Sequence, residues 1–306
     1  MCGLFGFSYY GHAPLKNLSS LTNALASESA IRGTDATGIA YTKNHVIQTI
    51  KEAKAAYKMK FQHSDDTVAL IGHTRHSTHG SEKKNWNNHP FGGKTKNANF
   101  ALAHNGVLTN DQKLRKALSL PKTKIETDSY IAVQLIEKKK QVDITSIRYM
   151  AEQIEGSFSF SILDDENNLY LVKGDSPLSI LHFPKRKIFV YASTDEILFK
   201  ALIDSPLFED LIGKNYEQMP ITEGMILKIM PDGQLEQSEF QYKDYYGMSW
   251  WEYDFNSGKR TTTPNEEYIN DLKMCALYQG VTAEEVDYLL NEGWTFEDIE
   301  EYIYAC

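Results

Sequence analysis

The chain has 306 residues, an apolar fraction of 42% and a formal net charge of −9. This length suits one large domain with an appendage or two domains, and the negative charge argues against nucleic acid or an anionic membrane as the main partner. Three scattered cysteines are too few for a disulfide framework, so we expect a reducing, cytoplasmic environment. No apolar run reaches the roughly 18 residues needed to cross a bilayer.

The first residues place a cysteine at a position where it can become the amino terminus. Residues 3–9 are apolar enough to predict a buried strand that holds the start of the chain in a core. If Met1 is removed, Cys2 carries a thiol and a free α-amine, which titrate near pH ~8.5 and ~8. One residue would then supply both the nucleophile and its activating base. The alternative is a buried structural cysteine.

A helix and a strand pair are predicted next. Apolar residues at helical spacing predict a helix over residues 15–30, and Gly33 is a candidate left-handed cap after it. Residues 39–41 and 46–50 are predicted to pair as strands across a short turn. Residues 51–63 are basic, so we expect them to form a surface segment.

Two buried-type strands then run directly into polar motifs. Residues 68–72 lead into a motif that begins at His73, and residues 100–103 lead into His104-Asn105-Gly106. The polar stretch 81–96 between them is predicted to be a long functional loop. Since each motif ends a buried strand, its side chains should lie at one edge of a core.

The first motif contains a candidate clamp for a substrate carboxylate. The guanidinium of Arg75 can pair bidentately with a carboxylate, although a structural ion pair is the alternative. Thr78 and His79 could line the same pocket. His73, His76 and His79 also suggest zinc, but a spacing of three residues fits neither a two-histidine helix nor a cysteine cluster. We therefore expect no metal site.

The later motifs offer an oxyanion hole and a carboxylate. The side-chain amide of Asn105 and the backbone N–H of Gly106 can converge on one developing negative charge. The alternative is an Asn-Gly turn between strands. Asp128 could pair with a substrate ammonium group or cap the helix that follows it; Thr127 is a second candidate for that cap.

The chain up to residue 240 is predicted to alternate between helices and strand pairs. Helices are predicted over residues 110–118, 131–138, 144–154 and 194–202. Strands are predicted at residues 158–163 with 169–172, at 178–183 with 188–192, and at 224–230 and Leu235. This alternation indicates an α+β sandwich of antiparallel sheets rather than a doubly wound parallel sheet.

The composition changes near residue 240, which predicts one domain over residues 1–240 and a C-terminal extension over residues 241–306. The extension starts with an aromatic stretch at 242–255. It ends with a short repeat, 280–286 and 293–299, in which each copy has a capping-box pattern and predicts a small helix. The extension could dock a partner or pack as a helical cap on its own domain.

Six motifs in this order resemble the class II glutamine amidotransferase domain, with the glutaminase domain of glucosamine-6-phosphate synthase as the most similar pattern. The resemblance covers roughly residues 2–235, and six motifs with similar gaps are far more specific than one. The motifs are Cys2-Gly3, Arg32-Gly33-x-Asp35-x-x-Gly38, His73-Thr74-Arg75-x-x-Thr78-His79-Gly80, Asn88-His89-Pro90, His104-Asn105-Gly106 and Glu126-Thr127-Asp128.

The resemblance implies an N-terminal nucleophile fold, a four-layer αββα sandwich, and a set of roles without a cofactor. It implies that Cys2 is the nucleophile and that Asn105 and Gly106 form the oxyanion hole. It also implies that Arg75 holds the α-carboxylate of glutamine and Asp128 its α-amine, with the pocket lined by Thr78 and His79. His76 departs from the pattern, because the synthase usually has tryptophan there.

The resemblance therefore predicts a glutamine amidohydrolase that acts through a γ-glutamyl thioester on Cys2. No acceptor domain of the family follows in this sequence, so we expect the ammonia to reach an acceptor enzyme on a separate chain. Two alternatives stay open: a hydrolase of another γ-glutamyl amide, and a partner-docking protein with this fold and little activity.

Overall fold

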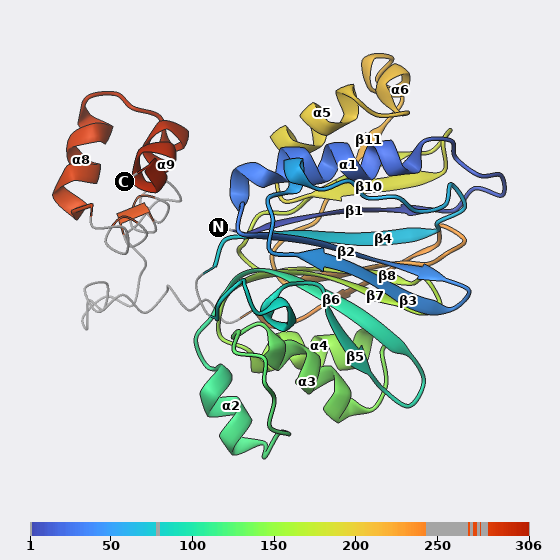
Figure 1. The fold of residues 1–306 in the computed structure, drawn as a ribbon, viewed down its shortest axis with the longest axis horizontal. Helices are drawn as coiled ribbons and strands as arrows, with labels where there is room; N and C mark the ends of the chain where they lie inside the picture. The colour runs from blue at the N-terminus through green and yellow to red at the C-terminus, as the bar shows by residue number, and fades with distance from the viewer. Residues whose placement is uncertain are drawn as a thin grey trace. The chain divides into compact units, whose positions relative to one another are not determined.

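The computed structural model describes residues 2–77, 80–242 and 281–305, together with residues 269, 272, 273 and 276. The chain divides into two compact units, Met1–Tyr245 and Tyr246–Cys306. In the first unit two antiparallel sheets lie face to face between two layers of helices (Figure 1). The predicted α+β sandwich is confirmed. In the described part of the chain, no helix is both long and apolar enough to cross a membrane.

The first sheet has seven strands in the order β11-β9-β10-β1-β4-β2-β3. Their bounds are β1 Gly3–Tyr9, β2 Ala36–Lys43, β3 Val46–Glu52, β4 Ala69–Arg75, β9 Ser179–Phe183, β10 Ile188–Ala192 and β11 Glu217–Gln218. Strand β1 lies in the middle, and all seven of its residues are buried. The predicted strand over residues 3–9 therefore holds the N-terminal residues at the centre of the fold.

The second sheet has six strands in the order β13-β12-β8-β7-β6-β5. Their bounds are β5 Phe91–Lys94, β6 Asn99–Leu108, β7 Gly156–Asp164, β8 Leu169–Lys173, β12 Met225–Ile229 and β13 Leu235–Glu239. Strands β6 and β7 pair along nine residues, from Phe100 opposite Asp164 to Leu108 opposite Gly156. Strand β5 lies inside the stretch predicted to be a loop.

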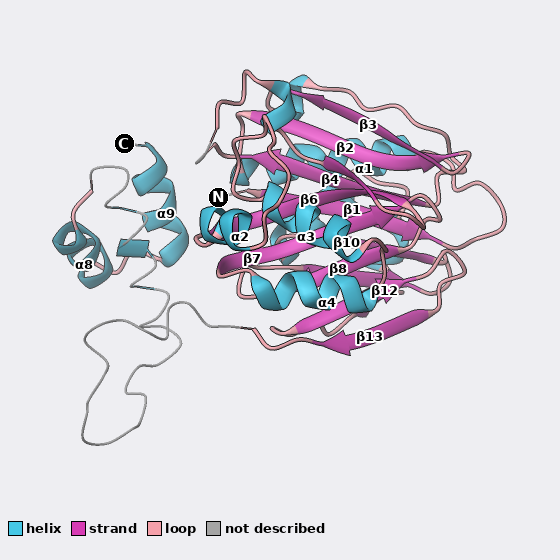
Figure 2. Ribbon diagram, turned by 90° about the horizontal axis from the view of Figure 1, so that it is seen from below, coloured by secondary structure: helices cyan, strands magenta, loops and turns pink. Residues whose placement is uncertain are grey.

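Helices cover the outer face of each sheet. Helices α1 (Leu18–Ser29), α5 (Asp195–Ile203) and α6 (Phe208–Ile212) lie on the side of the first sheet, and α2 (Asp111–Ala117), α3 (Tyr130–Lys139) and α4 (Ile144–Gln153) on the side of the second (Figure 1). Figure 2 shows α3 and α4 lying over the strands of the second sheet. Three short 3-10 helices, η1 (Ala30–Arg32), η2 (Ala56–Lys58) and η3 (Asn85–Asn87), connect other elements.

Three hydrophobic clusters separate the four layers, and the alternation of side chains along β1 explains why. Phe5 and Phe7 pack with α1 and α5, whereas Leu4 points the other way, into a cluster between the two sheets. Small residues such as Ala101 and Ala103 of β6 line that middle cluster. The period of two in a strand therefore decides which side chains can meet between the sheets.

One local prediction is wrong, and another is right only in part. Gly33 does not take a left-handed cap, because its φ is 178°, which is extended backbone. A side chain there would overlap the backbone of Arg75, so close approach of two chain segments is what requires glycine. The segment 51–63 lies mostly on the surface, but Phe61 is buried in the cluster that contains Phe5 and Phe7. Its first residue, Lys51, belongs to β3.

The second unit contains the two predicted helices, α8 (Ala283–Asn291) and α9 (Phe296–Ala305). The side chain of Thr282 accepts a hydrogen bond from the N–H of Glu285 at 3.2 Å. Thr295 and Asp298 bond reciprocally, each side chain to the other's backbone N–H, at 3.2 and 3.1 Å. The repeat therefore encodes two capped helices. Most of the aromatic stretch predicted at 242–255 lies outside the described residues.

Candidate active site

Three strands direct side chains into the space between the sheets at the same end of the sandwich. Leu4 of β1, Ile71 of β4 and Ala103 of β6 belong to the middle cluster. Side chains on one face of a strand recur every two residues. Cys2 therefore shares the face of Leu4, Arg75 that of Ile71 and Asn105 that of Ala103, each two or four residues nearer the end of its strand. In the antiparallel register Gly3 lies opposite Thr74, so Cys2 lies beside Arg75.

A hydrogen bond between the sheets holds this end of the sandwich together. The Nε2 atom of His73, in β4, lies 2.9 Å from the backbone oxygen of His104, in β6. His104 immediately precedes Asn105. Because His73 lies opposite Leu4, this bond also brings the start of β1 near the polar end of β6.

Cys2 is anchored through its backbone and its thiol. Its carbonyl oxygen accepts a hydrogen bond from Nε of Arg32 at 2.8 Å, and its Sγ lies 3.5 Å from the backbone oxygen of His76. Burial raises the pKa of the Cys2 thiol, while the charge of Arg75 lowers it and that of Asp128 raises it. The three ionisable groups therefore lie close enough to act on one another.

Arg75 is buried and held by neutral oxygen atoms. Its Nη1 donates to Oδ1 of Asn88 and its Nη2 to the carbonyl oxygen of Gly80, both at 2.7 Å. Burial lowers the pKa of Arg75, and the charges of Cys2 and Asp128 act in the opposite direction. These two bonds orient the guanidinium.

Asn105 and Gly106 lie inside β6, opposite Ser159 and Phe158, so the alternative of an Asn-Gly turn is wrong. Gly106 has φ +133°, and a side chain there would overlap the carbonyl group of Ser157. Asn105 is 2% exposed, and its Nδ2 has no hydrogen-bond partner among the described residues. A buried unpaired amide costs about 1–3 kcal/mol, so this donor is available to a bound group.

Asp128 is buried and does not cap a helix with its side chain. Its Oδ2 accepts a hydrogen bond from the N–H of Leu108 at 2.6 Å, and its Oδ1 lies 3.5 Å from Oγ of Ser129. The N-cap residue of α3 is Ser129, which makes no side-chain capping bond. The predicted capping by Thr127 or Asp128 is therefore wrong, and Asp128 instead contacts the end of β6.

His73, one of the three histidines that suggested zinc, lies against a histidine of another segment. The ring of His73 lies 4.1 Å from that of His89, and burial lowers the pKa of His73 to about 3 and that of His89 well below its usual value. Both rings are therefore neutral at pH 7. In the described ranges no three His, Cys, Asp or Glu side chains gather as a metal site. Thr78 and His79 lie outside the described residues, so their places stay predictions.

Sequence reasoning missed the residues that support Arg75. Lys51 is partly buried, and its Nζ donates to the carbonyl oxygens of Asn88 and Pro90 at 2.6 and 2.9 Å. Burial lowers the pKa of Lys51 to about 8. The motif Asn88-His89-Pro90 was visible in the sequence, but nothing local indicated that Asn88 contacts Arg75.

Comparison with known proteins places this arrangement in context. A family model described as a glutamine amidotransferase domain matches residues 73–200. The chain is 33% identical over 192 residues to glutamine–fructose-6-phosphate aminotransferase (isomerizing) of Bacillus thuringiensis subsp. konkukian, covering 59% of this chain and 30% of that protein. It is 30% identical over 188 residues to the protein of the same name from Geobacillus kaustophilus, with the same coverage. The chain thus spans less than a third of these relatives.

A solved structure shares the fold. Glutamine phosphoribosylpyrophosphate amidotransferase from B. subtilis, complexed with ADP and GMP, superposes with a TM-score of 0.61 and 22% identity, covering 79% of this chain and 50% of that one. A second structure, of an allosteric regulatory enzyme of purine biosynthesis, gives a TM-score of 0.60. These likenesses confirm the predicted four-layer sandwich fold.

Proposed function

We propose that the chain contains a class II glutamine amidotransferase domain that hydrolyses the side-chain amide of glutamine and releases ammonia. The observation that carries the proposal is the position of Asn105, a buried amide donor with no partner in the described part of the chain, at the strand end shared with Cys2 and Arg75. A nucleophile, a cation and an oxyanion donor in one place are what acyl transfer from an amino-acid amide requires.

The reaction begins once Met1 has been removed. The Cys2 thiol passes its proton toward the Cys2 α-amine, through a water molecule, and the thiolate attacks the amide carbon of glutamine. The resulting tetrahedral oxyanion accepts hydrogen bonds from Nδ2 of Asn105 and the N–H of Gly106. Each donor of this kind typically contributes about 3 kcal/mol to the stability of the transition state.

Collapse of the tetrahedral intermediate breaks the carbon–nitrogen bond. The α-amine of Cys2 returns the proton to the departing nitrogen, so ammonia leaves and a γ-glutamyl thioester stays on Cys2. Water then attacks the thioester, and its hydrolysis releases glutamate and restores the thiol. Atoms balance with glutamine and water as the only reactants.

Two opposite charges would select the amino-acid end of the substrate. The Arg75 guanidinium would pair with the α-carboxylate and the Asp128 carboxylate with the α-ammonium group. In the antiparallel register Cys2 lies beside Arg75, and the charges of Arg75 and Asp128 both act on the pKa of Cys2. Thr78 and His79 are proposed to line the same pocket.

We propose that the ammonia passes to an acceptor enzyme on a separate chain. The relatives are named as aminotransferases that act on fructose 6-phosphate, and this chain covers 30% of their length. The acceptor named for those relatives is therefore not transferred to this chain. It predicts that the purified chain releases glutamate and free ammonia when no acceptor is present.

The test is glutamate release by the purified full-length chain and by its Cys2→Ala variant. We expect the variant to lose all measurable turnover, because no other group in the proposal can form the thioester. Unchanged turnover by Cys2→Ala would refute the mechanism. A panel of γ-glutamyl amides run beside glutamine separates a glutaminase from a hydrolase of another γ-glutamyl compound, since Arg75 and Asp128 would recognise both.

A further inference from the structure

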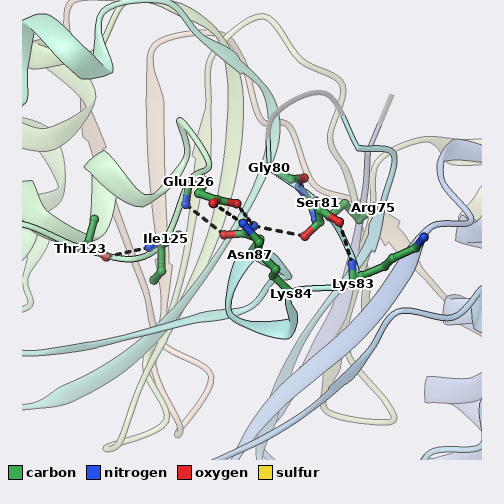
Figure 3. Close-up of polar contacts among 9 residues, drawn as sticks. All are labelled: Arg75, Gly80, Ser81, Lys83, Lys84, Asn87, Thr123, Ile125 and Glu126. Carbon is green, nitrogen blue, oxygen red and sulfur yellow. Dashed lines mark hydrogen bonds and ion pairs between the residues drawn. The ribbon is translucent and has the colours of Figure 1, made fainter.

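Two side chains that the reaction does not use tie together the segments that carry Arg75 and Asp128. Nδ2 of Asn87, in η3, donates to Oε2 of Glu126 at 2.8 Å, and the N–H of Glu126 donates to Oδ1 of Asn87 at 3.0 Å. Figure 3 shows these two bonds side by side. Asn87 is fully buried, and Lys84 pairs with the other Glu126 oxygen at 2.5 Å from the solvent side.

The Asn87–Glu126 pair reaches Arg75 by two routes. Gly80 accepts the Nη2 bond of Arg75 and lies against the pair: a Cβ there would be 2.9 Å from Nδ2 of Asn87 and 3.1 Å from Cβ of Glu126. Nδ2 of Asn87 also donates to the carbonyl oxygen of Ser81 at 3.2 Å. By the second route, Asn88 accepts the Nη1 bond of Arg75 and directly follows Asn87.

The same pair reaches Asp128 through the chain itself. Glu126 lies two residues before Asp128. The carboxylate of Asp128 is held in place by the N–H of Leu108, which donates to its Oδ2. Asn87 therefore lies next to Gly80 and Asn88, which accept the hydrogen bonds of Arg75. It also accepts a hydrogen bond from the backbone of Glu126, which leads into Asp128. Thirty-nine residues of sequence separate the two partners, so no local rule brings them together.

We propose that Asn87 and Glu126 are positioning residues that set the separation between the Arg75 guanidinium and the Asp128 carboxylate. The inference rests on the proposed function, in which these two charges bind the two ends of an amino acid. A substrate with one carboxylate and one ammonium group on the same carbon fits only one separation. The pair thereby determines that the pocket takes an α-amino acid, and it does so without contact with the reacting amide.

This role predicts a specific kinetic signature. A shift of about 1 Å between the two charges weakens substrate binding strongly, because both ion pairs depend on the same separation. Cys2 and Asn105 are not part of the network, so the chemical step should change little once substrate is bound. A loss in KM with little change in kcat distinguishes positioning of substrate charges from a general loss of structure.

The experiment measures glutamine hydrolysis by the full-length chain with Asn87→Asp, Glu126→Gln and the double variant. Asn87→Asp places two carboxylates face to face, and we expect KM for glutamine to rise at least about tenfold while kcat stays within about threefold. In the double variant the amide introduced at position 126 becomes the donor, and the carboxylate introduced at position 87 becomes the acceptor, while the bond from position 87 to the carbonyl oxygen of Ser81 stays broken. We expect KM to fall at least about threefold below the value for Asn87→Asp.

Lys84→Met is the matched control, because it removes the exposed ion pair to Glu126 and leaves the Asn87 bonds in place. Exposed ion pairs contribute little, so its KM should stay within about twofold of the wild-type value. Thermal melts of all variants check that each is folded. If Asn87→Asp does not fold, Glu126→Ala replaces it, and KM should then rise at least about threefold.

The outcomes separate two kinds of failure. No glutamine hydrolysis by the wild-type chain overturns the proposed function before any variant is compared. With an active wild type, an unchanged KM in Asn87→Asp or Glu126→Ala overturns the positioning role. A double variant whose KM is no lower than that of Asn87→Asp also overturns it, because the bond between positions 87 and 126 should carry a measurable part of the effect.

Discussion

The unpaired amide of Asn105 gives a prediction in which activity and stability move apart. In Asn105→Ala the proposed oxyanion donor is lost, and we expect kcat for glutamine hydrolysis to fall by about 10²–10³, which corresponds to about 3–4 kcal/mol of transition-state stabilisation. Truncation of a side chain that stabilises the fold would also lower the free energy of unfolding. Truncation of Asn105 should not, because its Nδ2 has no partner among the described residues.

The expected stability follows from two opposing contributions. Removal of a buried amide without a partner relieves about 1–3 kcal/mol of desolvation cost. The space left by the side chain costs a similar amount. We therefore expect the free energy of unfolding of Asn105→Ala to lie within about 1 kcal/mol of the wild-type value.

Asn110 is the matched control, since it is also a buried asparagine, at 5% exposure, next to the same strand. Its Nδ2 donates to the oxygen of Gln153 at 2.9 Å, and its Oδ1 accepts from the N–H of Glu155 at 3.0 Å. Asn110→Ala should lower the free energy of unfolding by about 2–3 kcal/mol, because two bonds break and two partly buried backbone groups lose their partners. Urea unfolding and initial-rate assays measure both variants. Equal destabilisation of the two variants, or a kcat within about threefold of wild type in Asn105→Ala, would refute the reasoning.

The remaining predictions concern the strands and helices that hold the site. Gly106→Ala should lower the free energy of unfolding by about 3 kcal/mol or more, because φ at this position is +133° and the added methyl group would overlap the backbone of β7. Gly92→Ala, where the added methyl group meets no atom within 4 Å, should change the free energy of unfolding by less than about 0.5 kcal/mol. Similar urea midpoints for the two variants would contradict this. Burial lowers the pKa of Lys51 from 10.5 to about 8, so the folded chain releases this proton at a lower pH than the unfolded chain. The stability of the wild type relative to Lys51→Met should then rise between about pH 8 and pH 10.5 in unfolding experiments, and a pH-independent difference would count against the burial of Lys51. Thr194→Ala should cost about 1 kcal/mol by loss of the side-chain cap on the N–H of Ile197, and no change in the urea midpoint would contradict that cap.

Most of the fold could be predicted because its elements carry local signals. The hairpin of β7 and β8 alternates or clusters apolar residues around a polar turn, and the predicted strands match those of the structure. The helix after Thr194 has a capping residue followed by acids, and it begins where predicted. Each of these signals lies within a window of about ten residues, so no distant partner is needed to recognise it.

The errors occur where a distant segment overrides a local preference. Asn-Gly is a turn signal in isolation, yet Asn105-Gly106 continues a strand because Ser157 and its neighbours pair with it. Gly33 looks like a helix cap, but the backbone after Arg75 is what excludes a side chain there. From the sequence Lys51 is expected on the surface, but in the structure its Nζ donates hydrogen bonds to the carbonyl oxygens of Asn88 and Pro90.

The site divides in the same way. Residues with distinctive chemistry, such as Cys2, Arg75 and Asp128, could be proposed as site residues from the sequence, and their roles stay predictions. The residues that orient them could not be named, because asparagine and glutamate are ordinary surface residues in a sequence. Asn87 and Glu126 become informative only when the fold brings them into contact.

The central claim is that Cys2, freed of Met1, attacks a glutamine side chain. Intact-protein mass spectrometry of the full-length chain, before and after incubation with an electrophilic glutamine analogue, tests it most directly. The account predicts a mass that lacks Met1, a single adduct that maps to Cys2, and protection of that residue by excess glutamine. Glutamine hydrolysis by a chain that retains Met1, or an active chain whose adduct lies on another residue, would contradict it.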